Sequence, residues 1–110
     1  MQTNPVTVKS IWLSAEEWAP GEWNPADDAA DIEVHLSDGS RWGGTFVTYR
    51  HLTTLRTRYA ASGECLGGRY FWAAGLVLID VLDRPSVEAV VGDMLATGEL
   101  QSALQPLLDS

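Results

Sequence analysis

A β-hairpin pattern occupies the middle of the sequence. Residues 32–36 (IEVHL) alternate apolar and polar side chains, which is typical of a strand with one buried face. The turn that follows, from Ser37 to Ser40, contains an Asp-Gly pair, the strongest short-range hairpin signal. Residues 41–48 then supply the returning strand. Because hairpin strands run in opposite directions, the sequence predicts an antiparallel sheet built around this hairpin.

The segments on either side complete an α+β pattern. Residues rich in β-branched and aromatic side chains predict further strands over Val6–Leu13, 70–72 and 76–82. Thr48 and Asp83 can cap two helices, which end at Gly63 and Gly98, and a short helical turn is expected after residue 99. The predicted order is β-ββ-α-ββ-α, an antiparallel sheet of four to five strands with two helices packed on one face. A chain of 110 residues, 1–110, is expected to be a single domain.

Charge is the clearest functional signal. The formal net charge is −8, and the stretch from Glu16 to Asp38 holds eight acidic residues with no Lys or Arg. Nucleic-acid binding is not expected, because neutralising phosphates requires a basic surface. An acidic surface attracts basic proteins and accelerates their association. The alternative is that these acids only keep the chain soluble and pair with the arginines of residues 41–69.

The long segment 14–30 combines acids with tryptophans, a residue type that dominates the energetics of protein interfaces. We therefore predict a partner-binding site there, made of Glu16, Glu17, Trp18, Glu22, Trp23, Asp27, Asp28 and Asp31. Two alternatives remain open. The rings of Trp18 and Trp23 can instead anchor the segment to the sheet, and the arginine-bearing residues 41–69 can instead form the contact surface.

No catalytic or metal-binding pattern is found in the sequence. His35 and His51 lack the spacing of metal ligands and are predicted to be outward-facing, so no metal and no cofactor is expected. The single cysteine, Cys65, excludes an internal disulfide and is predicted to be a small buried thiol. Asp80, within an apolar run, is predicted either to point to solvent or to pair with an arginine of the first helix or the hairpin, and the ion pair is the favoured interpretation. Neither a signal peptide nor a membrane-spanning segment is expected, which favours the cytoplasm.

Three longer stretches carry a resemblance to a known family. LSAEEWAPGEWNPADD, LSDGSRWGGTFVTYRHLTTL and ASGECLGGRYFWAAGLVLID resemble a family of small uncharacterised bacterial proteins with WxAEEWAPGEW, DGSRW and TGECLxGxYFWA motifs. The resemblance implies a bacterial, cytosolic protein and carries no assigned activity. In size and charge such chains are similar to immunity proteins, which neutralise toxins by binding them.

Two functions of different classes follow. The first is a non-enzymatic protein-binding module, an immunity protein whose acidic surface binds a basic toxin domain. The second is a small enzyme or ligand-binding domain, whose pocket would be lined by arginines and by Trp42, Cys65, Tyr70 and Trp72. The sequence makes no prediction of the oligomeric state.

Overall fold

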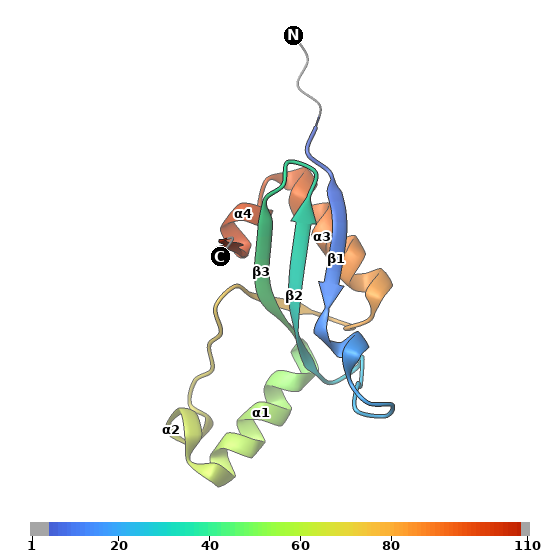
Figure 1. Ribbon diagram of the computed structural model, residues 1–110. Helices are drawn as coiled ribbons and strands as arrows, with labels where there is room; N and C mark the ends of the chain where they lie inside the picture. The colour runs from blue at the N-terminus through green and yellow to red at the C-terminus, as the bar shows by residue number, and fades with distance from the viewer. Residues whose placement is uncertain (1–4, 109–110) are drawn as a thin grey trace.

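The computed structural model describes residues 5–108, so the ends of the expected domain, 1–4 and 109–110, lie outside the described residues. Its centre is a five-stranded sheet in the order β1-β2-β3-β4, with β5 also paired to β3 (Figure 1). The strands are β1 (Val8–Leu13), β2 (Ala29–Leu36), β3 (Arg41–Thr48), β4 (Leu76–Ile79) and β5 (Gln105–Leu107). An α+β fold around an antiparallel sheet is therefore confirmed.

The predicted hairpin is the centre of this sheet. β2 and β3 pair without interruption from His35 opposite Arg41 to Ala29 opposite Val47. Gly39 adopts a φ of 87°, which glycine tolerates without steric cost, and this allows the tight turn. Every second residue of the run 30–36 is buried, as the alternation predicted. The buried side chains point toward α3 and form the core.

The outer edge of β3 is shared by two strands. β4 pairs with its second half in parallel, from Thr45 to Thr48, and is the one parallel partner in the described sheet. β5 pairs antiparallel with its first half, Arg41 to Gly43. β5 was not predicted, because a three-residue strand containing Pro106 has no sequence pattern of its own. Residues 70–72, predicted to be a strand, form an extended connection instead.

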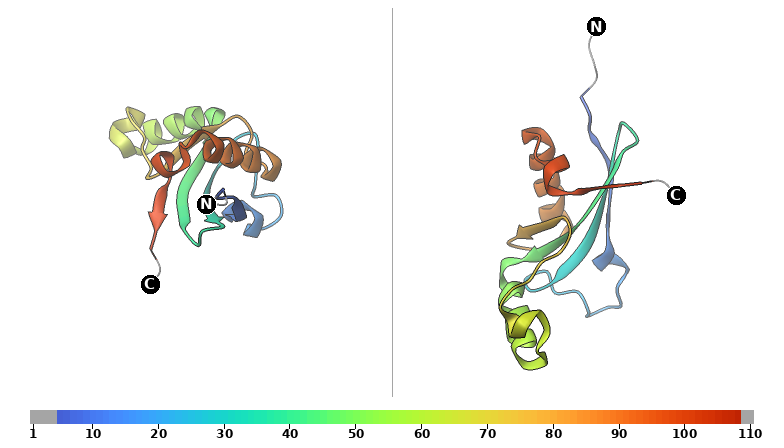
Figure 2. Two further views of the ribbon diagram at one scale, coloured as in Figure 1. Left: turned by 90° about the horizontal axis from the view of Figure 1, so that it is seen from above. Right: turned by 90° about the vertical axis from the view of Figure 1, so that its left-hand side faces the viewer.

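One helix covers the inner face of the sheet. α3 (Arg84–Thr97) begins where the Asp83 carboxylate accepts a hydrogen bond from the Ser86 N–H and ends at left-handed Gly98, as predicted. Val87 and Val91 face the sheet and are at most 1% exposed. The short helix η1 (Ser14–Glu17) connects β1 to β2, and α4 (Leu100–Ala103) follows α3 and contributes the buried Leu100 to the core. Figure 2 shows α3 and the sheet as two packed layers.

The other predicted helix forms an arm. α1 (Tyr49–Ser62) is capped by Thr48 and terminated by left-handed Gly63, as expected, and α2 (Glu64–Gly68) follows at its far end. α1 lies on the α3 side of the sheet but extends beyond the end of the strands (Figures 1 and 2). The molecule is consequently elongated, with dimensions of 59 × 30 × 29 Å. We refer to residues 49–75 as the arm.

His51 and Asp80 differ from the environments that the sequence favoured for them. His51 is buried rather than outward-facing, because it lies in the first turn of α1 against the segment before β2. Asp80 follows the end of β4 and is exposed, with its carboxylate accepting a hydrogen bond from the Val81 N–H. Of the two alternatives for Asp80, the structure therefore shows the solvent-facing one, and the favoured arginine pair is wrong.

Candidate functional site

The face of the sheet opposite α3 is not covered by a helix (Figure 2). Strand alternation places Trp12 of β1, the polar residues Asp31, Glu33 and His35 of β2, and Thr45 of β3 on this side. Trp12 lies opposite Glu33, and Glu33 lies opposite Gly43, so one row of residues crosses all three strands. Asp31 and Thr45 form the next row. This open face is the strongest candidate for a binding surface.

Acidic groups surround an exposed aromatic ring on this face. The Trp12 side chain is 42% exposed, and its indole N–H donates to the Glu17 carboxylate. Asp31 projects from the same side of β2 and accepts a hydrogen bond from the Thr45 hydroxyl at 3.3 Å. We name Trp12, Glu17, Asp31 and Glu33 the acidic sheet face.

The negative charge of Glu33 is partly compensated by basic neighbours, whereas Glu17 and Asp31 accept hydrogen bonds from uncharged groups. Glu33 Oε1 lies 2.8 Å from His35 Nε2 and 3.1 Å from Arg41 Nη1. The hydrogen-bond donors to Glu17 and Asp31, an indole and a hydroxyl, are uncharged. Glu17 and Asp31 therefore supply the negative potential beside Trp12.

Two glycines shape a shallow groove on this face. The groove has a volume of about 270 Å³ and runs between Trp12 and the side chain of Leu107. A Cβ atom on Gly43 would lie 3.0 Å from Leu107, and one on Gly44 would lie 2.4 Å from the Gly75 carbonyl oxygen. A side chain at position 43 would therefore fill the floor of the groove, and one at position 44 would displace the backbone at Gly75. The open form of the groove suits a protein surface or an extended segment more than an enclosed small molecule.

The eight residues predicted to bind a partner do not form one surface. Glu17 and Asp31 belong to the acidic sheet face, and Glu22 is exposed in the turn after η1. The Glu16 carboxylate instead pairs with Arg84 at 2.7 Å, which links η1 to α3 and holds the pKa of Glu16 below its usual range. Asp28 accepts a hydrogen bond from the Asn24 N–H at 3.1 Å and so stabilises the turn before β2.

Asp27 connects the acidic segment to the arm. Its carboxylate accepts hydrogen bonds from His51 Nδ1 at 2.7 Å and from the Thr54 hydroxyl at 2.8 Å. The hydrogen bond from His51, and to a smaller extent that from Thr54, holds the pKa of Asp27 below its usual range. The Asp27 carboxylate is therefore occupied within the molecule.

The two tryptophans of the segment anchor it to the core. Both rings pack against the buried core cluster, and the Trp23 indole N–H donates to the Leu82 carbonyl oxygen at 2.9 Å. The structure thus favours the anchoring alternative for Trp18 and Trp23. Their role in binding a partner would be to hold the segment in place.

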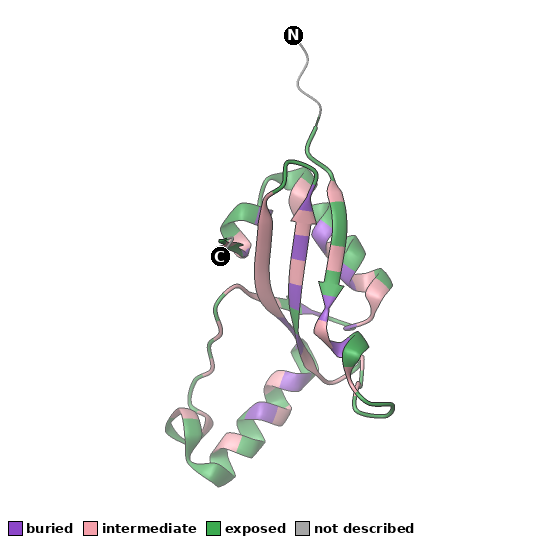
Figure 3. Cartoon of the chain, in the orientation of Figure 1, coloured by how far each residue is buried: buried purple, intermediate pink, exposed green. Residues whose placement is uncertain are grey.

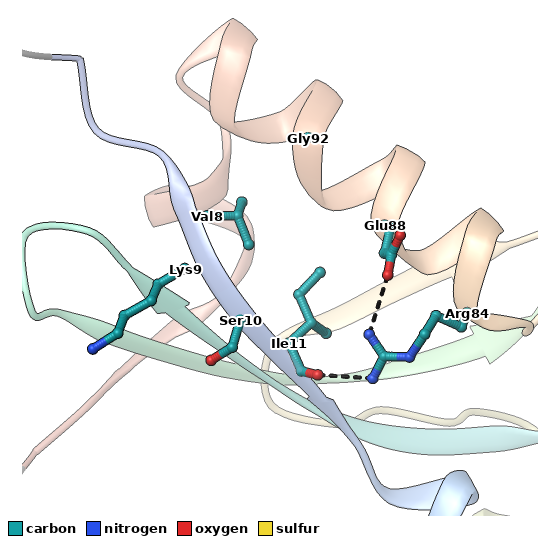
Figure 4. Close-up of a pocket in the computed structure, with 7 residues that line it drawn as sticks. All are labelled: Val8, Lys9, Ser10, Ile11, Arg84, Glu88 and Gly92. Carbon is teal, nitrogen blue, oxygen red and sulfur yellow. Dashed lines mark hydrogen bonds and ion pairs between the residues drawn. The ribbon is translucent and has the colours of Figure 1, made fainter.

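A second surface depression lies between β1 and α3 (Figure 4). It has a volume of about 550 Å³, and Val8, Ile11 and Gly92 contribute its apolar part. Arg84 crosses one end, where it donates to the Ile11 carbonyl oxygen at 2.8 Å and pairs with Glu88 at 3.2 Å. Because Arg84 occupies a backbone acceptor of this edge strand, adding a partner strand here would require breaking that hydrogen bond.

The arrangement expected for a small enzyme is not assembled. Trp42 lies within the sheet, paired with Val34 and Pro106, whereas Cys65 lies in α2 at the far end of the arm (Figure 1). Cys65 is half-buried, less than predicted, and Trp72 is 71% exposed. Over residues 5–108, no group of three or more His, Cys, Asp or Glu side chains is placed to hold a metal ion. Within the same residues, no helix is long and apolar enough to span a membrane.

The chain matches no protein-family model, no curated protein and no solved structure.

Sequence reasoning missed Trp12 and Glu33 as site residues. The signal was present in the alternation that identified the buried strand residues, because the residues between them must point the other way. What the alternation does not show is which face of the sheet the helices leave uncovered. That information comes from the packing of α3.

Proposed function

We propose that this chain is a non-enzymatic protein-binding module that acts in the cytoplasm and binds a basic protein through its acidic sheet face. The observation that carries the proposal is the partly exposed Trp12, which is hydrogen-bonded to Glu17 and lines one groove with Asp31 on an uncovered sheet. A large ring surrounded by charges can anchor an interface, because it buries much area and loses little conformational freedom.

The surrounding electrostatics favour a basic partner. With a net charge of −8, the molecule attracts cationic surfaces from a distance and orients them before contact. The antiparallel strands hold the site residues rigidly, so little ordering entropy is lost on binding. A Lys or Arg of the partner could then pair with Asp31 while its side-chain stem lies over Trp12.

More specifically, we propose that the partner is a bacterial toxin domain and that the chain is its immunity protein. The small size, the acidic surface and the resemblance to a bacterial family support this assignment. Binding would neutralise the toxin by covering a basic site on it, so the immunity protein itself would need no catalytic activity.

The proposal is tested by recovering the partner and measuring its binding kinetics. The tagged chain captures the partner from the native host, and association is followed at low and physiological salt. We expect Glu17→Lys with Asp31→Lys to slow association about tenfold or more at low salt, because attraction becomes repulsion. Trp12→Ala should mainly accelerate dissociation, because it removes the anchoring ring.

A matched control carries the same change in net charge elsewhere. Asp93→Lys with Glu99→Lys alters two exposed acids outside the acidic sheet face and should have a much smaller effect. Equal effects of the two double variants would show that only the overall charge matters, and the assigned face would be wrong. For the toxin assignment, the recovered partner should arrest growth when expressed alone, and co-expression of the wild-type chain, but not of Trp12→Ala, should restore growth.

A further inference from the structure

The arm is basic, whereas the rest of the chain is strongly acidic. Residues 49–75 contain four arginines and one acid, a net charge of +3. The remaining residues contain three Lys or Arg and fourteen Asp or Glu, a net charge of −11. All four arm arginines, Arg50, Arg56, Arg58 and Arg69, are exposed. The elongated molecule therefore has two oppositely charged parts.

The same arm exposes large apolar side chains. Tyr49, Leu66, Tyr70 and Trp72 are 52–71% exposed. Among the other large apolar residues that the structure describes, only Leu108 is as open, and the next is Trp12 at 42%. Figure 3 shows exposed residues along most of α1 and α2, with buried positions only in the half of α1 nearest the sheet. Three of the four, Leu66, Tyr70 and Trp72, are close together in sequence, and neighbouring exposed apolar residues commonly mark an interaction site. A surface that is both basic and aromatic requires an acidic partner with apolar contact area.

Charge decides among the possible occupants. Two arms repel each other, because both are positively charged. A nucleic acid is disfavoured, because it is anionic throughout and offers the −11 remainder of the chain no positive surface, whereas a second copy offers its own arm. A second copy of this chain offers both required features, since its acidic sheet face combines the exposed Trp12 ring with two carboxylates, Glu17 and Asp31, whose hydrogen-bond donors are uncharged.

We propose that the arm of one molecule docks on the acidic sheet face of a second copy, and that the reciprocal contact forms a two-fold symmetric dimer. Both contacts are then identical, as a closed dimer requires. In each contact, arginines of α1 face Glu17 and Asp31. The proposal rests on the same face as the proposed function, so the arm and a basic partner compete for it.

The oligomeric state tests the contact without any other protein. Molar mass is measured by light scattering and sedimentation over a concentration series at low and high salt. We expect a dimer that dissociates as salt increases, because the contact is mainly electrostatic. Arg56→Glu with Arg58→Glu (the arm variant) and Glu17→Lys with Asp31→Lys (the face variant) should each weaken dimerisation about tenfold or more.

Mixing the two variants provides the sharpest result. The altered arm of the first is complementary to the altered face of the second, and their two unaltered surfaces are also complementary. An equimolar mixture should therefore form heterodimers although each variant alone is monomeric. Asp93→Lys with Glu99→Lys, the matched control, should remain dimeric, and circular dichroism should show native folding for every variant.

Other results would overturn the inference. A wild-type chain that stays monomeric at all concentrations contradicts it, as does a dimer that the arm variant leaves unchanged, or a mixture that stays monomeric. So does arm-dependent binding of fluorescent single-stranded DNA at physiological salt, because the arm would then have another ligand. The arm variant keeps the acidic sheet face, so loss of its dimer with retained partner binding separates this inference from the proposed function.

Discussion

At the scale of single residues, acids close together in sequence perform different tasks. Glu16 binds Arg84 and fastens η1 to α3, whereas its neighbour Glu17 receives only the Trp12 indole N–H. Asp27 fastens the segment to α1, whereas Asp31 faces the open side of the sheet. Some acids of this segment therefore hold parts of the molecule together, and others, Glu17 and Asp31, supply negative charge on the open face of the sheet.

The Asp27 contact predicts a pH dependence of stability. The pKa of Asp27 lies below its ordinary value of 3.8 in the folded state, because His51 and Thr54 donate to the carboxylate. A depressed pKa stabilises the fold at neutral pH, and this contribution disappears as the pH falls below about 4 toward the folded pKa. We expect Asp27→Asn to lower the urea midpoint at pH 7, and we expect this difference from wild type to shrink progressively as the pH is lowered below about 4.

Asp93→Asn, on the exposed side of α3, serves as the control and should keep the wild-type pH profile. A difference between wild type and Asp27→Asn that stays constant from pH 7 to pH 3 would mean that the Asp27 charge does not contribute.

At the scale of secondary-structure elements, close approach of the backbones at Gly44 and Gly75 determines how the chain that returns from the arm joins the sheet as β4. The Thr45 N–H donates to the Gly75 carbonyl oxygen at 3.0 Å, just where β4 joins β3. Only a residue without a side chain at position 44 permits this approach. Gly92 in α3, by contrast, has open space around the position of a Cβ.

These two glycines predict opposite effects of the same substitution. Gly44→Ala should destabilise the protein by about 2 kcal/mol or more, because the added carbon collides with backbone that cannot move independently. Gly92→Ala should stabilise it by up to about 1 kcal/mol, because alanine is the better helix former and meets no neighbour. Urea unfolding measures both. Similar destabilisation by the two substitutions would contradict the structure around β4.

At the scale of the whole molecule, stability and charge are distributed unequally. The core lies between α3 and the inner sheet face, where strand and helix side chains are almost fully buried. The arm contributes little to that core, and within α1 the residues classed as buried are His51 and Leu55. Its far end is stabilised mainly by local contacts, such as the stacked rings of Tyr59 and Phe71, 6.5 Å apart.

Hydrogen exchange should show this difference. In the arm variant under dilute, monomeric conditions, amides of β2 and β3 should exchange only through global unfolding, whereas the second half of α1 and α2 should open locally and exchange faster. Mass spectrometry of peptides from each element measures the rates. Equal protection of the arm and the sheet would indicate that the arm belongs to the same cooperative unit as the core.

The sequence by itself determined the elements whose signals are local. Alternation with an Asp-Gly turn specified the β2–β3 hairpin, and the capping residues Thr48 and Asp83 with terminal glycines specified α1 and α3, because each signal acts through neighbouring backbone groups. The acidic character was likewise a matter of composition. Only the tertiary structure decided which face of the sheet stays open and that α1 extends as an arm. It also decided which acids form contacts within the molecule, Glu16 with Arg84 and Asp27 with His51. Those outcomes depend on contacts between residues distant in the chain, such as Glu16 with Arg84, and no local pattern encodes them.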